Sequence, residues 1–251
     1  MAQIQSGYGK IKLFDDFCGP EIPVANAVAY GTSAGGCNYY IGDFSVKGDL
    51  GETDTGIVSL SKSGGWVRIS GNNEDGKGAA ICSEIVFSPA LNGTLVLEAR
   101  VEMQALTTRS VFIGFCGTAA DDIAEPLTSV TVTHTLTAAN LCGFVMDSQL
   151  TAATAWHACY NGGSTTGATA STTTTTGVVA VAGDAQVLRI EIDPNGTARY
   201  YIDGNLESTV EGAVSTTALQ AAILGCWGTT TTAADLDADY FAVEANRDWT
   251  P

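Results

Sequence analysis

The stretch from Gln186 to Leu206, QVLRIEIDPNGTARYYIDGNL, constrains the fold of this chain more than any other. Apolar and polar side chains alternate from Leu188 to Ile192, which is the period-two pattern of a strand with one buried face. The sequence DPNG at 193–196 then provides a tight turn, because proline fixes φ and Asn-Gly tolerates positive φ. Alternation resumes over residues 197–203. The stretch therefore predicts an antiparallel β-hairpin.

Other segments have the patterns of further strands. Leu95 to Met103 alternates between an apolar and a largely charged face, whereas Ser110 to Cys116 is apolar on both faces, as a central strand would be. Two later segments, AAILGCW at 221–227 and ADYFAVE at 238–244, also predict strands. No helical period extends over ten residues, and no repeat of fixed length occurs. Many short strands joined by Gly- and Asn-rich turns indicate an all-β sandwich or barrel.

The charge of the chain limits its classes of partner. Acidic residues outnumber basic ones 27 to 11, which gives a formal charge of −16 over 251 residues. A nucleic-acid backbone or an anionic membrane surface would repel such a chain, so neither is expected as a partner, whereas a basic surface would attract it. The N-terminus lacks the apolar core of a signal peptide, so we expect synthesis in a reducing cytoplasm. The seven cysteines, none in a CxxC pair, are therefore predicted to be buried free thiols.

The strand segments together resemble a known family. The opening LFDDF, the pair LEARVEM and SVFIGFCG, the hairpin LRIEIDPNGTARYYIDGN and the closing DADYFAVE are similar to the concanavalin A-like (laminin G-like) jelly roll. The resemblance extends from about Leu13 to Glu244. It implies an antiparallel β-sandwich over residues 13–246, with an N-terminal arm at 1–12, a Thr-rich loop or thin β-excursion at 162–177 and a C-terminal tail at 247–251.

Many domains of this fold hydrolyse or bind glycans, so the chain was compared with the catalytic pattern of the family-16 glucanase-like enzymes. That pattern, E-x-D-x-E or E-x-D-x-x-E, places alternate carboxylates on one strand face. The nearest match here is Glu191-Ile192-Asp193, which lacks the second glutamate and ends at a turn. We therefore expect the two carboxylates to belong to the polar face of a strand, and we expect no glycosidase activity.

Thr-, Ala- and Gly-rich acidic versions of the fold resemble structural proteins of tailed bacteriophages. This resemblance implies a non-enzymatic capsid decoration (cement) protein, located in the virion and made in the host cytoplasm. Its partner would be the major capsid protein or another virion protein, and it would form a homo-oligomer such as a trimer. The residues expected to contact partners are Met1, Ile4, Tyr8 and Ile11 of the arm and Trp249 of the tail.

A glycan-binding module of a phage fibre or tail is the alternative. Aromatic side chains stack on sugar rings, and the aromatic residues placed near predicted loops are Tyr39, Tyr40, Trp156 and Tyr160.

Two further sets of side chains have the residue types of chemical sites. Asp235, Asp237 and Asp239 alternate along one strand, so they could bind Ca²⁺ as a cofactor or form a solvated acidic edge that prevents aggregation. His134 and His157 are far apart in sequence and show no metal-ligand spacing. A dyad of His157 with Cys159 would also need an oxyanion pocket, so structural roles are expected for both histidines.

Overall fold

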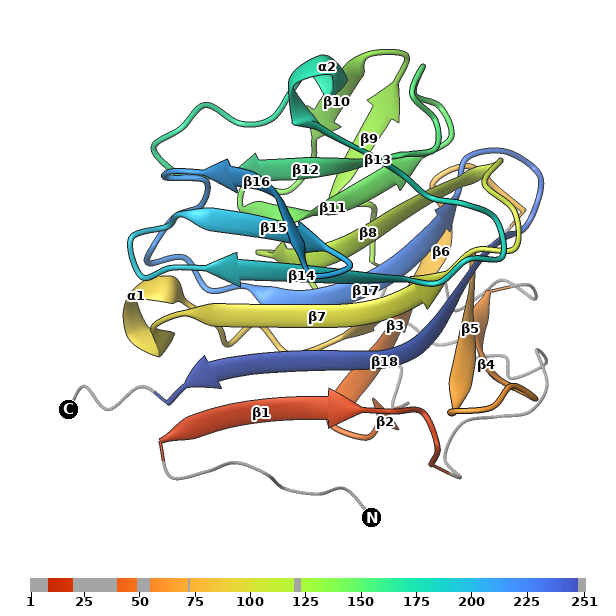
Figure 1. Cartoon of the computed structure of the whole chain (residues 1–251), viewed down its shortest axis with the longest axis horizontal. Coiled ribbons are helices and arrows are strands. Elements are labelled where there is room, and N and C mark those ends of the chain that lie inside the picture. Colours follow the sequence, from red (N-terminus) through yellow and green to blue (C-terminus); the bar gives the residue numbers. More distant parts are fainter. Residues whose placement is uncertain (1–8, 20–39, 49–54, 72, 120–122, 248–251) are drawn as a thin grey trace.

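Two antiparallel β-sheets lie face to face in the computed structural model, which describes residues 9–19, 40–48, 55–71, 73–119 and 123–247 (Figure 1). Sheet A has the order β16 (Asn205–Val210), β15 (Ala198–Ile202), β14 (Gln186–Ile192), β7 (Leu95–Glu102), β18 (Ala234–Asn246), β5 (Trp66–Gly71) and β4 (Gly56–Leu60), and β1 (Lys10–Asp15) also pairs with β18. Sheet B has the order β13 (Thr175–Val179), β12 (Ala155–Asn161), β11 (Leu141–Asp147), β8 (Arg109–Cys116), β17 (Ala221–Gly228), β6 (Gly78–Cys82), β3 (Phe44–Gly48) and β2 (Tyr40–Ile41). The predicted antiparallel β-sandwich of concanavalin A-like jelly-roll type is confirmed.

The predicted hairpin forms the centre of one half of sheet A. Leu188 of β14 pairs with Ile202 of β15, and the backbone N–H of Gly196 donates to the carbonyl of Asp193 at 2.9 Å in the turn. On its other side β14 pairs with β7, which places Ile190 opposite Leu97. The two clearest strand patterns in the sequence are therefore neighbours in the sheet.

The space between the sheets is filled by the main apolar core. Sheet A contributes the side chains that alternate inward, such as Leu97, Ile190 and Phe241, and sheet B contributes Ile113 and Phe144 among others. All of these side chains are buried. The core explains the alternation seen in the strands of sheet A, because their other face points to solvent.

The N-terminal boundary differs from the prediction. The arm was expected to end at residue 12, but β1 begins at Lys10 and pairs along the second half of β18, with Lys12 opposite Glu244. Ile11 was expected to contact partners; it is half-buried and packs against the main core instead. The first half of β18 pairs with β5. On its other side β18 pairs with β7, and the register of that pairing shifts between Ala238 and Tyr240.

A third layer covers the outer face of sheet B. It contains the hairpin of β9 (Leu127–Val130) and β10 (Thr133–Leu136) and the single turn α2 (Ser171–Thr174). Beneath it lies a second apolar cluster that includes Phe112, Val145 and Trp227, each from a different strand of sheet B. Central strands of sheet B are accordingly buried on both faces, which confirms the interpretation of residues 110–116 as a central strand.

The Thr-rich segment is part of this construction and not simply an exposed loop. Residues 171–174 form α2, and residues 175–179 form β13, the edge strand of sheet B. Ser171 and Thr174 are buried. Within the segment 162–177, only residues 175–177 lie in a strand, where threonine is favoured, and the helical turn α2 before them was not predicted.

Glycines allow aromatic rings to lie flat on the outer face of sheet B. A Cβ atom on Gly143 would lie 2.6 Å from two ring carbons of Phe112, and one on Gly78 or Gly225 would collide with the ring of Trp227. The indole N–H of Trp227 donates to the carbonyl of Ile123 at 3.0 Å. These rings therefore tie the sheet to the segment that leads into the third layer.

Six cysteines lie in the described part of the chain, and all are free. Five of them are buried, as predicted, whereas Cys18 is exposed, and Cys37 lies outside the described residues. Burial raises the pKa of the thiol of Cys116 to about 11, so it remains protonated near neutral pH. No helix among the described residues has the length and apolar character needed to cross a bilayer.

We expect Gly143→Ala to lower the free energy of unfolding by about 1–3 kcal/mol, because its methyl group overlaps the ring of Phe112 in a closely packed layer. Urea denaturation followed by Trp fluorescence measures this change. Gly117→Ala is the matched control, since a Cβ there meets Asn140 only at 3.4 Å or more, an ordinary contact. Equal stability of the two variants would contradict the packing described here.

Candidate functional site

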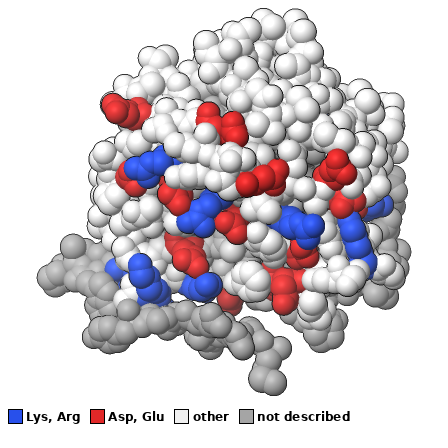
Figure 2. All heavy atoms as spheres, in the orientation of Figure 1, with Lys and Arg blue, Asp and Glu red and all other residues white. Residues whose placement is uncertain are grey.

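The outer face of sheet A carries most of the paired charges. Figure 2 shows Lys and Arg interspersed with Asp and Glu across the face on which sheet A lies in Figure 1. The pairs follow the strand register: Arg189 of β14 lies opposite Glu98 of β7 with an N–O distance of 3.2 Å, and Lys12 lies opposite Glu244 at 2.8 Å. Opposite charges on directly facing residues stabilise neighbouring strands. This face is therefore electrostatically matched within the chain itself.

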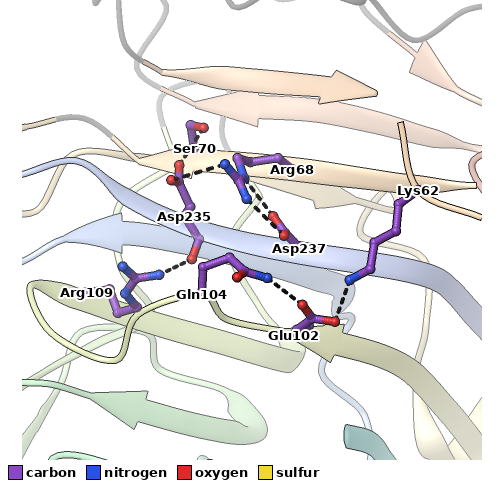
Figure 3. Close-up of polar contacts among 8 residues, drawn as sticks. All are labelled: Lys62, Arg68, Ser70, Glu102, Gln104, Arg109, Asp235 and Asp237. Atoms are coloured by element: carbon purple, nitrogen blue, oxygen red, sulfur yellow. Dashed lines mark hydrogen bonds and ion pairs between the residues drawn. The ribbon is translucent and has the colours of Figure 1, made fainter. Parts of the chain in front are cut away.

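The predicted calcium ligands lie in this lattice and are held by arginine (Figure 3). Asp237 is 2% exposed and accepts two hydrogen bonds from the guanidinium of Arg68, at 2.7 and 3.0 Å. Asp235 accepts a hydrogen bond from Ser70 at 2.8 Å and also faces Arg68. Asp239 lies at the register shift of β18 and pairs with Arg100 at 2.5 Å.

Asp235 and Asp237 thus share Arg68, and Asp239 pairs with Arg100, so the three carboxylates face arginine side chains and do not form one oxygen cage. Among the described residues, no group of three or more His, Cys, Asp and Glu side chains could hold a metal ion. The hydrogen bond with Asp237 raises the pKa of Arg68, which is the reciprocal sign of a stable pair. Of the two alternatives, the structure therefore favours the polar strand edge over a Ca²⁺ site at Asp235, Asp237 and Asp239, because arginine supplies the positive charge.

The same close-up contains three further hydrogen bonds around strands β7, β8 and β18 (Figure 3). Glu102 of β7 accepts hydrogen bonds from Lys62 and from Gln104, both at 2.5 Å. Arg109 of β8 donates to the main-chain carbonyl of Asp235, so a side chain from sheet B reaches the strand β18 of sheet A. Lys62 also lies over the ring of Trp66 at 3.6 Å, a cation–π contact.

The carboxylates nearest to a glucanase pattern are also held by arginine. The carboxylate of Glu191 forms an ion pair with Arg189 at an N–O distance of 2.7 Å and lies 3.9 Å from a guanidinium nitrogen of Arg199. Asp193 forms an ion pair with Arg199 at 2.5 Å. A catalytic pair needs carboxyl groups that face a substrate, whereas these two carboxylates face the arginine side chains of their own sheet. The geometry agrees with the expectation that these residues belong to the polar face of a strand.

The structure separates the aromatic residues predicted to contact glycans. Trp156 was expected near a loop, but it is fully buried in the main core, and its indole N–H donates to Gln186 at 2.8 Å. Tyr160 is partly buried against both apolar clusters. Tyr40 is 61% exposed and remains available, and Tyr39 lies outside the described residues. Trp156 is therefore a wrong assignment.

The residues predicted to contact partners cannot be placed together. Met1, Ile4, Tyr8 and Trp249 lie outside the described residues, and Ile11 belongs to β1.

A buried polar cluster beneath the third layer was not predicted. His134 of β10 and His157 of β12 are buried, and their rings lie edge to face with centroids 5.4 Å apart. The hydroxyl of Thr174 in α2 lies 3.0 Å from Nε2 of His134 and 3.0 Å from Nδ1 of His157. One hydroxyl proton can serve only one ring, so the other ring must donate, and both rings fit as neutral tautomers.

The cluster continues toward two buried carboxyl groups. Nδ1 of His134 lies 3.0 Å from the hydroxyl of Ser129, and this serine and Ser110 face the carboxylate of Asp147. Burial raises the pKa of Asp147, and the hydrogen bonds from the Gln149 backbone and the two serines oppose this rise only in part. Burial also raises the pKa of Glu125 to about 8. Oδ2 of Asp147 and Oε1 of Glu125 have no hydrogen-bond partner.

This cluster contains the residue types of a hydrolase site, but its arrangement is structural. Both histidines are almost completely inaccessible, and burial lowers the pKa of His134 to about 4. The hydroxyl of Ser129 lies close to a ring nitrogen of His134, but the residue is only 1% exposed, so a substrate cannot reach the hydroxyl. A nucleophile must be reached by substrate. One sequence signal could have indicated the cluster: Asp147 ends a strand that is otherwise apolar on both faces.

Solved structures of other proteins share the fold at low sequence identity. The β-glucanase of Bacillus licheniformis is 12% identical, with a TM-score of 0.53, and the alignment covers 94% of this chain and 98% of that one. A protein of unknown function from Shewanella oneidensis MR-1 is 12% identical, with a TM-score of 0.52 and coverages of 96% and 89%. The carbohydrate recognition domain of Emp46p is 8% identical, with a TM-score of 0.52 and coverages of 80% and 87%.

These similarities establish the jelly-roll sandwich and nothing about activity, because identities of this size are compatible with unrelated functions. No protein-family model matches the chain, and no curated protein matches its sequence.

We expect Arg68→Met to lower the free energy of unfolding by roughly 1.5–3 kcal/mol, because Asp237 would lose a charged hydrogen-bond partner at a buried position. Arg199→Met is the control, since Asp193 lies at a turn and is 24% exposed, so the loss should be under about 1 kcal/mol. Chemical denaturation of both variants with and without Ca²⁺ checks the result. Stabilisation of the wild-type chain by Ca²⁺ would contradict the assignment of these aspartates to ion pairs.

The buried carboxyl of Glu125 predicts a pH dependence. Its pKa rises from an ordinary value of 4.5 to about 8, so the folded chain keeps a proton that the unfolded chain has lost between these values. Stability from this group is therefore complete below about pH 4.5 and is lost as the pH rises to 8.

Between pH 7 and 8 the histidines are largely neutral in both states, so the loss from Glu125 should be about 1 kcal/mol. Glu125→Gln removes the titrating group at nearly the same size, so denaturation curves of this variant should give a flatter profile. A wild-type profile that rises over this interval would refute the buried, protonated state.

Proposed function

We propose that this chain is a non-enzymatic structural protein of a phage virion, a decoration or cement protein that docks on an assembled shell. The observation that carries the proposal is that side chains on the outer faces of both sheets are used in contacts within the chain. The third layer covers the central strands of sheet B, and arginines hold the alternating carboxylates on sheet A.

Such a molecule is suited to mechanical work. Long strands, register-matched ion pairs and two apolar clusters favour a rigid body that can bridge neighbouring subunits without changing shape. A docked module stabilises the assembled state because it binds that state and not the free subunits. Symmetry repeats each contact over the shell, so a weak single interface suffices. The net charge of −16 favours a basic docking surface.

A glycan-binding module of a fibre or tail is the second candidate, and the exposure of Tyr40 favours it. A single aromatic ring at the short strand β2 can stack on a sugar. Tyr40→Ala separates the candidates, because it should abolish binding on a glycan array if this role is correct and leave particle binding unchanged if the decoration role is correct.

The proposal is tested by sedimentation with purified virions from the source of the sequence. We expect the chain to co-sediment at a fixed copy number per shell, measured by quantitative mass spectrometry, and to add back to shells from which it has been removed. A chain that stays in the supernatant at every concentration, or whose copy number varies with the amount added without saturation, would refute a specific docking role.

The contribution of the N-terminal segment is tested by removing residues 1–8. This deletion leaves the described strand β1 intact, whereas removing residues 1–12 would delete half of its pairing with β18. If the segment is a docking arm, the shortened chain should keep its unfolding midpoint and lose binding to shells. Unchanged binding would refute the arm and transfer docking to the body of the sandwich.

A further inference from the structure

The charges of this chain are distributed unevenly along its sequence. From Pro126 to Gly183, Asp147 is the only residue that carries a formal charge, although the whole chain contains 38 charged residues, of which 27 are acidic and 11 basic. Asp147 is 1% exposed. The surface formed by residues 126–183 is therefore free of ionised side chains, and we call it the neutral cap.

The neutral cap is one continuous end of the molecule. It contains β11, β12 and β13, which are consecutive strands at one edge of sheet B, together with the β9–β10 hairpin and α2 (Figure 1). In Figure 2 the upper part of the view, where these elements lie, is white, whereas the band below it carries both signs of charge. The uncharged run of residues 126–183 therefore also forms one region in space.

The cap presents apolar side chains on a fixed support. Val130 is 64% exposed, and Val132, Val179 and Val181 are each between 45% and 49% exposed. The tip of the hairpin is anchored by three backbone hydrogen bonds, including Thr131 N–H to the Gln149 carbonyl at 2.9 Å and Ser171 N–H to the Val132 carbonyl at 2.9 Å. A rigid apolar patch loses little conformational entropy when it is covered.

The edge of the cap is built to avoid strand addition. In β13 the N–H of Gly177 donates to the hydroxyl of Thr175 at 3.2 Å, and the N–H of Val178 donates to the hydroxyl of Thr176 at 3.2 Å. Gly177 has a φ of +79°, and the pairing with β12 is irregular. These features block an incoming strand. Contact with the cap must therefore be made through side chains.

We propose that the neutral cap binds the neutral cap of a second copy of this chain. A basic partner would gain nothing from a surface without carboxylates, and it would be attracted to the acidic parts of the molecule instead. Two copies with a charge of −16 repel each other unless their charged surfaces point apart. Cap-to-cap contact through the hairpin tip achieves this separation and covers Val130 and Val132, which lie within the uncharged run of the sequence.

Purified wild-type chain and the variants Val130→Asp and Leu206→Asp test this proposal by analytical ultracentrifugation over a wide concentration range. Each variant adds one negative charge at a side chain that is more than half exposed, but only Val130 lies in the cap. We expect the wild type and Leu206→Asp to self-associate and Val130→Asp to remain monomeric, with all three unfolding at similar urea concentrations.

Ionic strength provides the second measurement. Salt screens repulsion between the acidic bodies and has no ion pair to weaken in a cap-to-cap interface, so association should become tighter as salt rises. A monomeric wild type, equal effects of the two substitutions, or weaker association at high salt would overturn the proposal. These outcomes are measured on the purified chain alone, so they do not depend on whether the chain binds a virion.

Discussion

The burial of sheet B on both faces is the constraint on which the rest of this structure depends. One face is covered by sheet A and the other by the β9–β10 hairpin, α2 and their connections. A strand between two apolar layers cannot alternate, so β8 and β17 are apolar throughout. Two aromatic side chains fit beneath the third layer only because glycines lie under their rings.

Sheet A solves the opposite problem, since its outer face has no further layer. Its strands place basic residues directly opposite acidic ones, so a large share of the eleven basic residues is used within the sheet. Charge is therefore sorted along the chain: a matched face lies on sheet A, and an uncharged surface is formed by residues 126–183. Each region favours a different kind of contact.

The sequence predicted the parts of the molecule that depend on local pattern. The hairpin, the alternation of Leu95–Glu102 and the doubly apolar strand Arg109–Cys116 follow from side-chain period and turn residues alone. Predictions from the sequence failed where the role of a residue depends on a contact with a residue that lies elsewhere in the chain. The alternating aspartates of β18 suggested a metal site, and their pattern gives no sign of Arg68, which is 169 residues from Asp237. Trp156 was placed near a predicted loop, and the local pattern gives no sign that it donates to Gln186 of the other sheet.

The histidine cluster extends this reasoning to the third layer. Threonine, alanine and valine side chains pack with little preference for one register, so such a layer could slide over sheet B. The contacts of His134, His157 and Thr174 join β10, β12 and α2 at one point, and Ser129 connects them toward Asp147 at the end of β11. Buried polar groups cost stability unless they meet the correct partners, so only one placement of the layer satisfies them. The uncharged residues of the third layer do not specify its position on sheet B. The buried polar contacts that lead from the histidines to Asp147 specify this position instead.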